Sequence, residues 1–265
     1  MSQRFDLYLP GDTWLHRLDP RTKLWMVFTA GVVALTYKHL AVPAALLILA
    51  HLALLSARVP FSLIRWLWLR LLPLLLMILI LQPFFPPGPG LELFRLGPLR
   101  VTLPGVLEGL SFALRAAALA FIAAVLLLTT DPTQLVQGLV KLGLPYPWGL
   151  TVGLAIRYLP ITYSLFVTAN EAQQARGWIV GQGNVVQRAR SYLPILVATI
   201  IAALRLSDGL GLALAARGLG YPARRTVLHE LYFSLADGLV VALTTVIFVG
   251  LMVLRFGAGI GGRTW

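Results

Sequence analysis

Long apolar runs, interrupted by few charged residues, dominate this chain. Hydrophobic residues make up 58% of its 265 residues and charged residues only 12%, whereas soluble proteins average roughly 45–50% and 25%. A helix that crosses a bilayer takes roughly 20 mainly apolar residues. The sequence therefore excludes a soluble globular domain as the leading class and predicts an all-α integral membrane protein.

Five apolar runs are predicted to be transmembrane helices. They cover residues 24–37, 40–57, 66–85, 105–129 and 235–254. The first 23 residues contain too many charges to form the apolar core of a signal peptide. We therefore expect three parts: residues 1–130 with the first four helices, 131–233, and 234–265 with the last helix.

The segment 131–233 differs from the rest in its pattern. Asp131 followed by Pro132 is a typical helix start, and apolar residues then recur at helical spacing up to Leu142. A short amphipathic helix is expected there. Two longer helices are predicted at 148–176 and 189–217, and each has a length of about 43 Å.

Charged residues argue against placing these two long helices within the bilayer. Arg157 lies at the midpoint of the first. In the second, the apolar stretch between Arg190 and Arg205 rises only about 21 Å, short of the roughly 30 Å hydrocarbon core. We therefore expect 131–233 to be a cytoplasmic segment at or below the membrane interface.

The distribution of Lys and Arg supports this topology. With the N-terminus in the cytoplasm, 16 of the 22 basic residues lie inside and five outside, with Arg115 inside the fourth span. The alternative inserts 149–170 and 191–210 as a further hairpin, which gives seven spans. It places Arg157 in mid-bilayer, where an Arg costs about 2.5–3.5 kcal/mol on the insertion scale, and the choice between five and seven spans stays open.

Composition also limits the partners and the chemistry. The net charge of +12 suits a surface that faces anionic membrane lipid. Nucleic acid is not expected, because the basic residues are spread thinly between apolar runs. The chain has no Cys, no phosphate-binding loop motif and only four scattered His, so we expect no enzyme activity, metal site or cofactor.

Few ionisable residues fall inside the predicted spans. Glu108 and Arg115 lie two turns apart, and they either pair or bond elsewhere, Arg115 to a neighbouring carbonyl. Asp237 follows Ser234 at the spacing of a capping box, so we expect it to cap the last span. His51 is expected to be packed or hydrogen-bonded.

A repeated tripeptide is the most distinctive motif. Ala175-Arg176-Gly177 and Ala216-Arg217-Gly218 stand 41 residues apart, each at the end of a predicted long helix that contains a proline, Pro160 or Pro194. Arg in a last turn followed by Gly is ordinary at a helix C-terminus. An exposed guanidinium beside two small residues is also a docking device for a carboxylate on another protein.

These motifs resemble those of a known family, the transmembrane T component of energy-coupling factor (ECF) transporters, which includes cobalt and biotin versions. The resemblance covers nearly the whole chain. It rests on Leu15-His16-Arg17-Leu18-Asp19-Pro20-Arg21-Thr22-Lys23, on Ala155-Ile156-Arg157-Tyr158-Leu159-Pro160, on Glu171-Ala172-Gln173-Gln174 before the first Ala-Arg-Gly, and on the second Ala-Arg-Gly.

The resemblance implies a non-catalytic membrane scaffold in an ABC-type uptake complex. Two crossed cytoplasmic coupling helices would end in the Ala-Arg-Gly motifs and insert into grooves of two ATP-binding-cassette ATPases, with Arg176 and Arg217 making ionic contacts. Arg157, Glu171, Pro160 and Pro194 would give structural support. ATP would be bound by the partner subunits, and a separate membrane (S) component would capture the vitamin or metal ion.

Leu214 and Leu219 depart from the family pattern, where a methionine and an aromatic residue are expected. This difference concerns how the end of the predicted helix 189–217, with its Ala-Arg-Gly motif, would pack against a partner. The alternative function is a stand-alone secondary permease that binds a small solute at the bilayer midplane, although only Glu108 and Arg115 offer charge there. An intramembrane enzyme would need a convergent set of His, Asp or Ser that the sequence does not supply.

Overall fold

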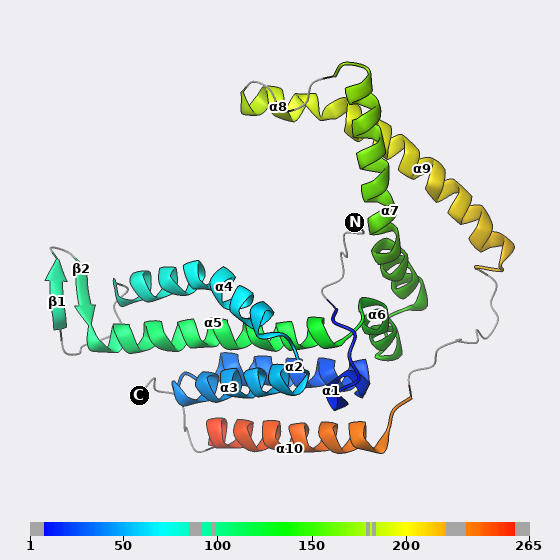
Figure 1. The fold of residues 1–265 in the computed structure, drawn as a ribbon. Coiled ribbons are helices and arrows are strands. Elements are labelled where there is room, and N and C mark those ends of the chain that lie inside the picture. Colours follow the sequence, from blue (N-terminus) through cyan, green and yellow to red (C-terminus); the bar gives the residue numbers. More distant parts are fainter. Residues whose placement is uncertain are drawn as a thin grey trace. The chain divides into compact units, whose positions relative to one another are not determined.

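A computed structural model describes residues 8–84, 92–96, 99–178, 181, 184–220 and 232–257 of the chain (Figure 1). The chain divides into two compact units, of which the first is Met1–Leu144 with Leu231–Trp265 and the second is Pro145–Glu230. Four arginines of the charge count, Arg4, Arg224, Arg225 and Arg263, lie outside the described residues. The functional boundaries expected at 130/131 and 233/234 stay a prediction.

The first unit is built almost entirely from helices. Its elements are α1 (Trp14–Arg17), α2 (Pro20–Thr36), α3 (Ala41–Ser56), α4 (Phe61–Leu81), the 3-10 turn η1 (Gln82–Phe84), β1 (Glu92–Leu96), β2 (Leu99–Thr102), α5 (Leu103–Thr129), α6 (Pro132–Lys141) and α10 (Leu235–Gly257). The all-α class is thus confirmed, with one short hairpin as the exception.

Side-chain caps and prolines explain where three of these helices begin. Asp19 accepts the N–H of Arg21 at the start of α2, Thr102 caps α5, and Asp131 accepts the N–H of Thr133 at 2.6 Å to start α6. Each cap stands just before a proline near the first helical position, where the missing N–H costs nothing. The predicted Asp131 cap and the short helix after it are confirmed.

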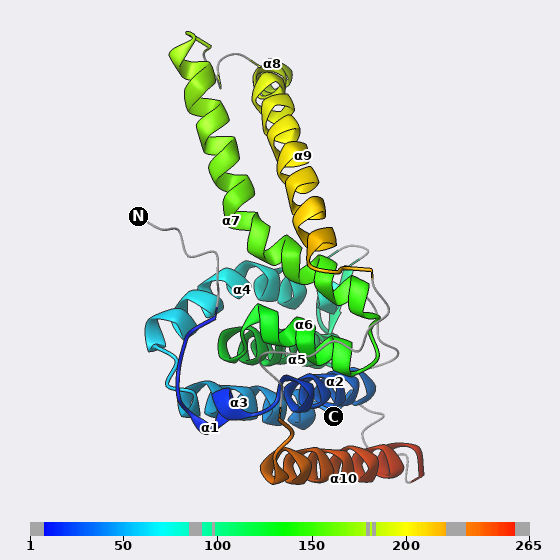
Figure 2. The ribbon, with the colours of Figure 1, turned by 90° about the vertical axis from the view of Figure 1, so that its right-hand side faces the viewer.

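Helix α5 is the centre of the first unit, as Figure 2 shows from the side. It packs against α2, α3 and α4, and its buried face consists largely of small residues, among them Ala113, Ala117 and Ala118. Small side chains let helix backbones approach closely, which is the usual packing mode in membranes. Phe121 of α5 is fully buried in the main apolar cluster with residues of α1, α3 and α4.

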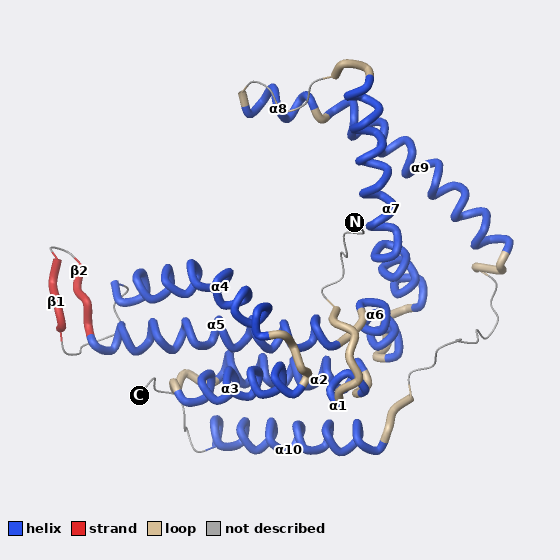
Figure 3. Tube along the Cα trace, in the orientation of Figure 1, coloured by secondary structure: helices blue, strands red, loops and turns tan. Residues whose placement is uncertain are grey.

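The hairpin lies where the sequence suggested only a connection rich in Pro and Gly. Strands β1 and β2 pair antiparallel, with Leu96 opposite Leu99 nearest the turn, and Figure 3 marks them in red. Although Leu99-Arg100-Val101-Thr102 alternates apolar and polar residues, the strands are only five and four residues long, so the surrounding Pro and Gly led to the prediction of a connection alone.

Five described helices are long and apolar enough to cross a membrane, but they are not the predicted five. Those at 61–84, 103–129 and 235–257 match predicted spans, while α2 and α3, with 17 and 16 residues, are shorter than the roughly 20 residues of a typical span. The other two are 146–175 and the stretch 185–216, which consists of two helices separated at Tyr192. By length, the stretches 146–175 and 185–216 could also cross a membrane, although their charged residues argue against it. The cytoplasmic position of 131–233 stays a prediction.

The second unit consists of α7 (Tyr146–Ala175), α8 (Val185–Ser191) and α9 (Leu193–Ala216). Helices α7 and α9 pack against each other, and Figure 1 shows their axes inclined to one another. Pro160 lies inside α7, where it removes one backbone hydrogen bond and favours a bend. Figure 2 shows α7 changing direction along its length.

The second predicted long helix, 189–217, is not continuous. Pro194 is the second residue of α9, and the separate helix α8 ends three residues earlier at Ser191. Proline cannot donate a hydrogen bond and its ring clashes with the preceding turn, whereas it suits the first turn of a new helix. The expectation of a proline inside this helix was therefore wrong for Pro194 and right for Pro160.

Candidate functional site

The first Ala-Arg-Gly motif forms a complete C-terminal cap on α7. Arg176 is the last half-helical residue, and Gly177 follows in the left-handed region with φ +80°. The N–H of Gly177 donates to the carbonyl of Gln174 at 2.9 Å, and the N–H of Trp178 donates to the carbonyl of Gln173 at 3.0 Å. This pair of bonds is the Schellman motif, which satisfies the free carbonyls at a helix end.

The second motif repeats this geometry on α9. Gly218 has φ +75°. Its N–H donates to the carbonyl of Ala215, and the N–H of Leu219 donates to the carbonyl of Leu214, both at 2.9 Å. The two tips therefore place an arginine at the same position of the same cap, directly before the chain leaves the helix.

Glycine is required at both tips by backbone conformation. Among the residues that the structure describes, an added Cβ at Gly177 or at Gly218 would meet nothing within 4 Å, so none of these neighbours demands a small residue. The left-handed φ does, because it costs roughly 1–2 kcal/mol for a residue with a Cβ. The reading of each Arg-Gly pair as a helix stop is confirmed.

The helix stop does not account for the side chains that the tips present. Arg176 and Arg217 are exposed, and neither makes a side-chain hydrogen bond or ion pair with any residue that the structure describes. An apolar side chain follows each glycine, Trp178 with 44% exposure and Leu219 with 37%. Each tip thus offers a permanent cation beside an apolar contact, a pairing suited to an acidic groove on another protein.

A hydrogen-bonded connection supports the first tip. The indole N–H of Trp178 donates to the carbonyl of Ser191 at 2.8 Å, and the N–H of Gly181 donates to the hydroxyl of Ser191 at 3.3 Å. These bonds join the end of α7 to the end of α8. The orientation of Trp178 is therefore fixed by the chain itself.

Of the other predicted site residues, Arg157, Pro160 and Glu171 lie on α7 and Pro194 lies on α9. Arg157 and Glu171 are exposed, and neither has a side-chain partner among the described residues. Pro160 stands between them, and Pro194 starts α9. The structure does not bring these four together with the two tips into one cluster.

A buried polar cluster in the first unit went unnoticed in the sequence. The ammonium of Lys23 donates to the carbonyl of Thr129 at 2.9 Å, to the hydroxyl of Thr130 at 3.1 Å and to the carbonyl of His16 at 3.4 Å. Lys23 is only 4% exposed. From the first turn of α2, the Lys23 ammonium therefore provides a hydrogen-bond donor to the acceptors at the C-terminal end of α5.

Asp237 completes this cluster at the start of α10. Its carboxylate accepts the N–H and the hydroxyl of Ser234 and the N–H of Asp19, while its own N–H bonds to the Ser234 hydroxyl. The capping box predicted from the spacing of Ser234 and Asp237 is confirmed. The bond to Asp19 had no sequence signal, since the two residues come from opposite ends of the chain.

The intramembrane Arg115 bonds to a carbonyl. It donates to the carbonyl of Tyr37 at 2.9 Å, at the C-terminal end of α2, and its guanidinium lies over the ring of Phe112. Arg255 adds a longer bond to the neighbouring carbonyl of Thr36 at 3.4 Å. Of the two alternatives for Arg115, a bond to a neighbouring carbonyl or a pair with Glu108, the bond to a carbonyl is confirmed.

His51 is hydrogen-bonded through both ring nitrogens. Its Nε2 accepts the indole N–H of Trp68 at 3.1 Å, so Nδ1 carries the proton and donates to the carbonyl of Leu47 at 2.8 Å. The imidazole also packs on Phe121, with ring centroids 4.4 Å apart. The expectation of a packed, bonded histidine is confirmed.

Comparisons with known proteins show what the chain is similar to. A family model described as cobalt transport protein, CbiQ, matches residues 11–227. The energy-coupling factor transporter transmembrane protein EcfT of Thermosediminibacter oceani is 33% identical over 264 residues, covering 94% of this chain and 96% of its own length. The protein of the same name from Leuconostoc gelidum is 32% identical and covers 87% and 88%, and that from Acidaminococcus fermentans is 31% identical and covers 94% and 96%.

Proposed function

The chain belongs to the CbiQ cobalt transport protein family and is a transmembrane component of an energy-coupling factor transporter; from this premise we propose that it couples ATP hydrolysis in partner subunits to solute import. The tips of α7 and α9 dock two ABC-type ATPases. A separate S component in the membrane binds the vitamin or metal ion. The chain itself holds no catalytic site and no cofactor, and ATP is bound by the partner subunits.

The single observation that carries this proposal is the matched geometry of the two tips. Arg176 and Arg217 occupy the same position of two Schellman caps, and both side chains are exposed and without partners in the described part of the chain. Two helix ends with the same cap geometry suit docking grooves of the same kind on two ATPase subunits. A carboxylate in each groove would accept two parallel hydrogen bonds from the planar guanidinium.

The apolar residues beside the arginines favour a groove over a flat acidic surface. Trp178 and Leu219 project directly after the glycines and remain well exposed. Interfaces typically bury aromatic and aliphatic anchors at the centre with charged residues paired around them. The larger Trp178 predicts a wider contact at the first tip than at the second.

The exposed face of α9 supports a second contact, with membrane components. Large apolar residues between Leu193 and Leu204 stay 40% or more exposed in the single chain: Leu193, Leu196, Val197, Ile200, Ile201 and Leu204. Such a face is costly in water. We assign it to the S component and surrounding lipid, with α9 at the membrane interface.

This arrangement requires the tips to lie on the ATP side of the membrane. It therefore places the N-terminus and segment 131–233 in the cytoplasm, as the distribution of Lys and Arg favours. ATP-driven movement of the two ATPases would shift α7 and α9, which pack against each other. That movement would reach the S component through the second unit.

Affinity purification of the detergent-solubilised complex tests the docking role. The wild-type chain should co-purify with two ABC-type ATPase subunits and a small membrane protein. The double variant Arg176→Glu/Arg217→Glu should lose the ATPases by at least roughly tenfold, because each reversed charge leaves a buried carboxylate facing a like charge. The small membrane protein should remain bound.

A matched control separates docking from total charge. Arg188→Glu/Arg190→Glu makes the same change in net charge on exposed arginines of α8 in the same unit, and it should keep both ATPases. Full retention of ATPases and uptake by the Arg176/Arg217 variant would contradict the proposal. A wild-type chain that purifies alone and transports solute in liposomes without ATP would favour the secondary permease.

A further inference from the structure

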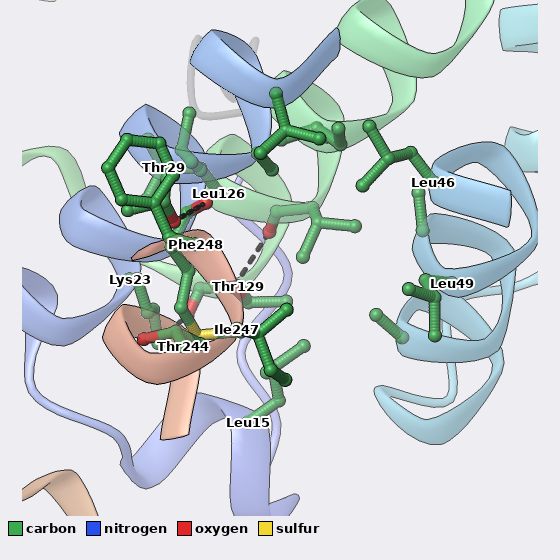
Figure 4. A pocket seen from close by; sticks show the side chains of 18 of the residues that line it. Leu15, Lys23, Thr29, Leu46, Leu49, Leu126, Thr129, Thr244, Ile247 and Phe248 are labelled. Atoms are coloured by element: carbon green, nitrogen blue, oxygen red, sulfur yellow. Dashed lines mark hydrogen bonds between the residues drawn. The ribbon is translucent and has the colours of Figure 1, made fainter. Parts of the chain in front are cut away.

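The first unit contains an apolar cavity, open on one side, that the coupling role does not use. Its volume is about 260 Å³, and it lies between α2, α3, α5 and α10 (Figure 4). Leu46 and Leu49 of α3 face it from one side, and Thr244, Ile247 and Phe248 of α10 face it from the other. Every lining residue belongs to the first unit.

The few polar groups in the cavity wall are already bonded. The hydroxyls of Thr29, Thr129 and Thr244 each donate to carbonyls of their own helix. The ammonium of Lys23 is occupied by its bonds to Thr129, Thr130 and His16. A buried water needs two to four polar partners, so this wall favours neither water nor a polar ligand.

The mouth of the cavity continues into the outer apolar surface of the helices. Leu49 of α3 is 59% exposed and Ile247 of α10 is 52% exposed. Helix α10 is long and apolar enough to cross a membrane. In a bilayer these two side chains contact the hydrocarbon of lipids, so the cavity opens toward acyl chains.

We propose that this cavity binds one acyl chain of a membrane phospholipid, whose headgroup stays outside. An apolar cavity of about 150 Å³ already takes benzene while remaining dry, and this one is larger. An empty void of this size would forfeit the dispersion contacts of its lining. The bound chain fills the space between α3 and α10 and acts as part of the packed core.

This inference does not rest on ATPase docking, so its failure and that of the coupling role are distinguishable. The full chain is reconstituted in phosphatidylcholine and phosphatidylglycerol vesicles that contain a phospholipid with a photoactivatable diazirine in mid-chain. After illumination, mass spectrometry locates the label. Label is expected on cavity residues that are less exposed than Leu49 and Ile247 at the mouth, such as the half-buried Met26 of α2 and Phe248 of α10.

Two filling variants and a matched control make the test specific. Ala30→Leu extends into the cavity from α2 and Ala53→Leu from α3, so each should reduce label at Met26 and Phe248 by about fivefold. Both should raise the melting temperature in lipid-poor detergent, because they replace a void with protein. Ala45→Leu makes the same change on α3 at an exposed residue outside the cavity and should alter neither readout.

Two results would overturn the proposal. The first is label at the cavity residues that no filling variant reduces, since it would reflect general contact with lipid. The second is loss of the label at the cavity residues in the co-purified transporter complex, since it would show that a partner protein occupies the cavity there. Retained label in that complex supports the acyl chain.

Discussion

The backbone N–H of Asp19 donates to Oδ1 of Asp237 at 2.8 Å, across a separation of 218 residues. The bond joins the start of α2 to the start of α10, and both residues are buried. Three further polar contacts join the same two helices: the indole N–H of Trp25 donates to the hydroxyl of Thr245, the hydroxyl of Tyr37 to the carbonyl of Leu251, and the guanidinium of Arg255 to the carbonyl of Thr36. Together with the Asp19 bond they fix the position of α10 along α2.

Asp237→Ala should destabilise the first unit by about 2–4 kcal/mol. The substitution leaves the N–H groups of Asp19 and Ser234 without their acceptor, and buried polar groups without partners are costly. Asp237→Asn keeps an acceptor oxygen and should cost less. The free energy of unfolding is measured by reversible denaturation in mixed micelles.

The control for this change is Asp208→Ala, which removes an exposed carboxylate from α9. It should shift stability by less than about 0.5 kcal/mol, as surface substitutions usually do. An Asp237→Ala protein as stable as the control would show that the cluster contributes nothing.

Lys23→Met should loosen the end of α5. Methionine keeps most of the apolar stem of Lys23 but leaves the Thr129 carbonyl and the Thr130 hydroxyl without their donor, at a cost of about 1–3 kcal/mol. Hydrogen exchange near the end of α5 should become faster than in the wild type. Lys38→Met, at an exposed lysine, should leave that exchange unchanged.

Gly177→Ala and Gly218→Ala should each fray a helix tip. The left-handed φ angles of +80° and +75° impose a cost of about 1–2 kcal/mol on Ala, and space for the methyl group is open. Asn tolerates this conformation better, so Gly→Asn should cost less. Exchange rates of the last-turn amides measure the difference, and equal rates for Ala and Asn would contradict the backbone explanation.

A double-mutant cycle on Trp68 and His51 should give a coupling energy of about 0.5–1.5 kcal/mol. Trp68→Phe removes the indole donor, and His51→Leu removes the acceptor at Nε2. The two single changes should therefore cost more in sum than the double change. Strict additivity would indicate that the 3.1 Å bond contributes no net stability.

The features predicted correctly from sequence were those set by neighbours two to five residues apart. The Asp131 cap, the Ser234 and Asp237 capping box and both Arg-Gly helix stops depend on backbone groups in the same turn. Local spacing encodes such contacts directly. The family resemblance then added the interpretation of the tips.

The contacts that went unpredicted join distant parts of the chain. Lys23 reaches Thr129 across 106 residues, and Arg115 reaches Tyr37 across 78. Which carbonyl each cation meets depends on how whole helices pack, and spacing carries no information on that. The break at Pro194 was different, because the known conflict of proline with a helix interior could have predicted it.

Membrane topology stayed open because two physical criteria disagree for the second unit. Helix α7 has the length of a span, yet it carries Arg157, and α2 and α3 are shorter than a typical span. Length measures whether a helix can reach across hydrocarbon, and charge measures what insertion costs. Neither includes the contribution of partner subunits.

The hydrogen bonds of His51 bear on proton transfer across the membrane. A histidine within a membrane protein can relay protons, since one nitrogen can accept a proton while the other releases one. In His51 both positions are taken, Nε2 by the Trp68 indole and Nδ1 by the Leu47 carbonyl. With neither ring nitrogen left open, His51 provides no relay for protons between the helices that surround it.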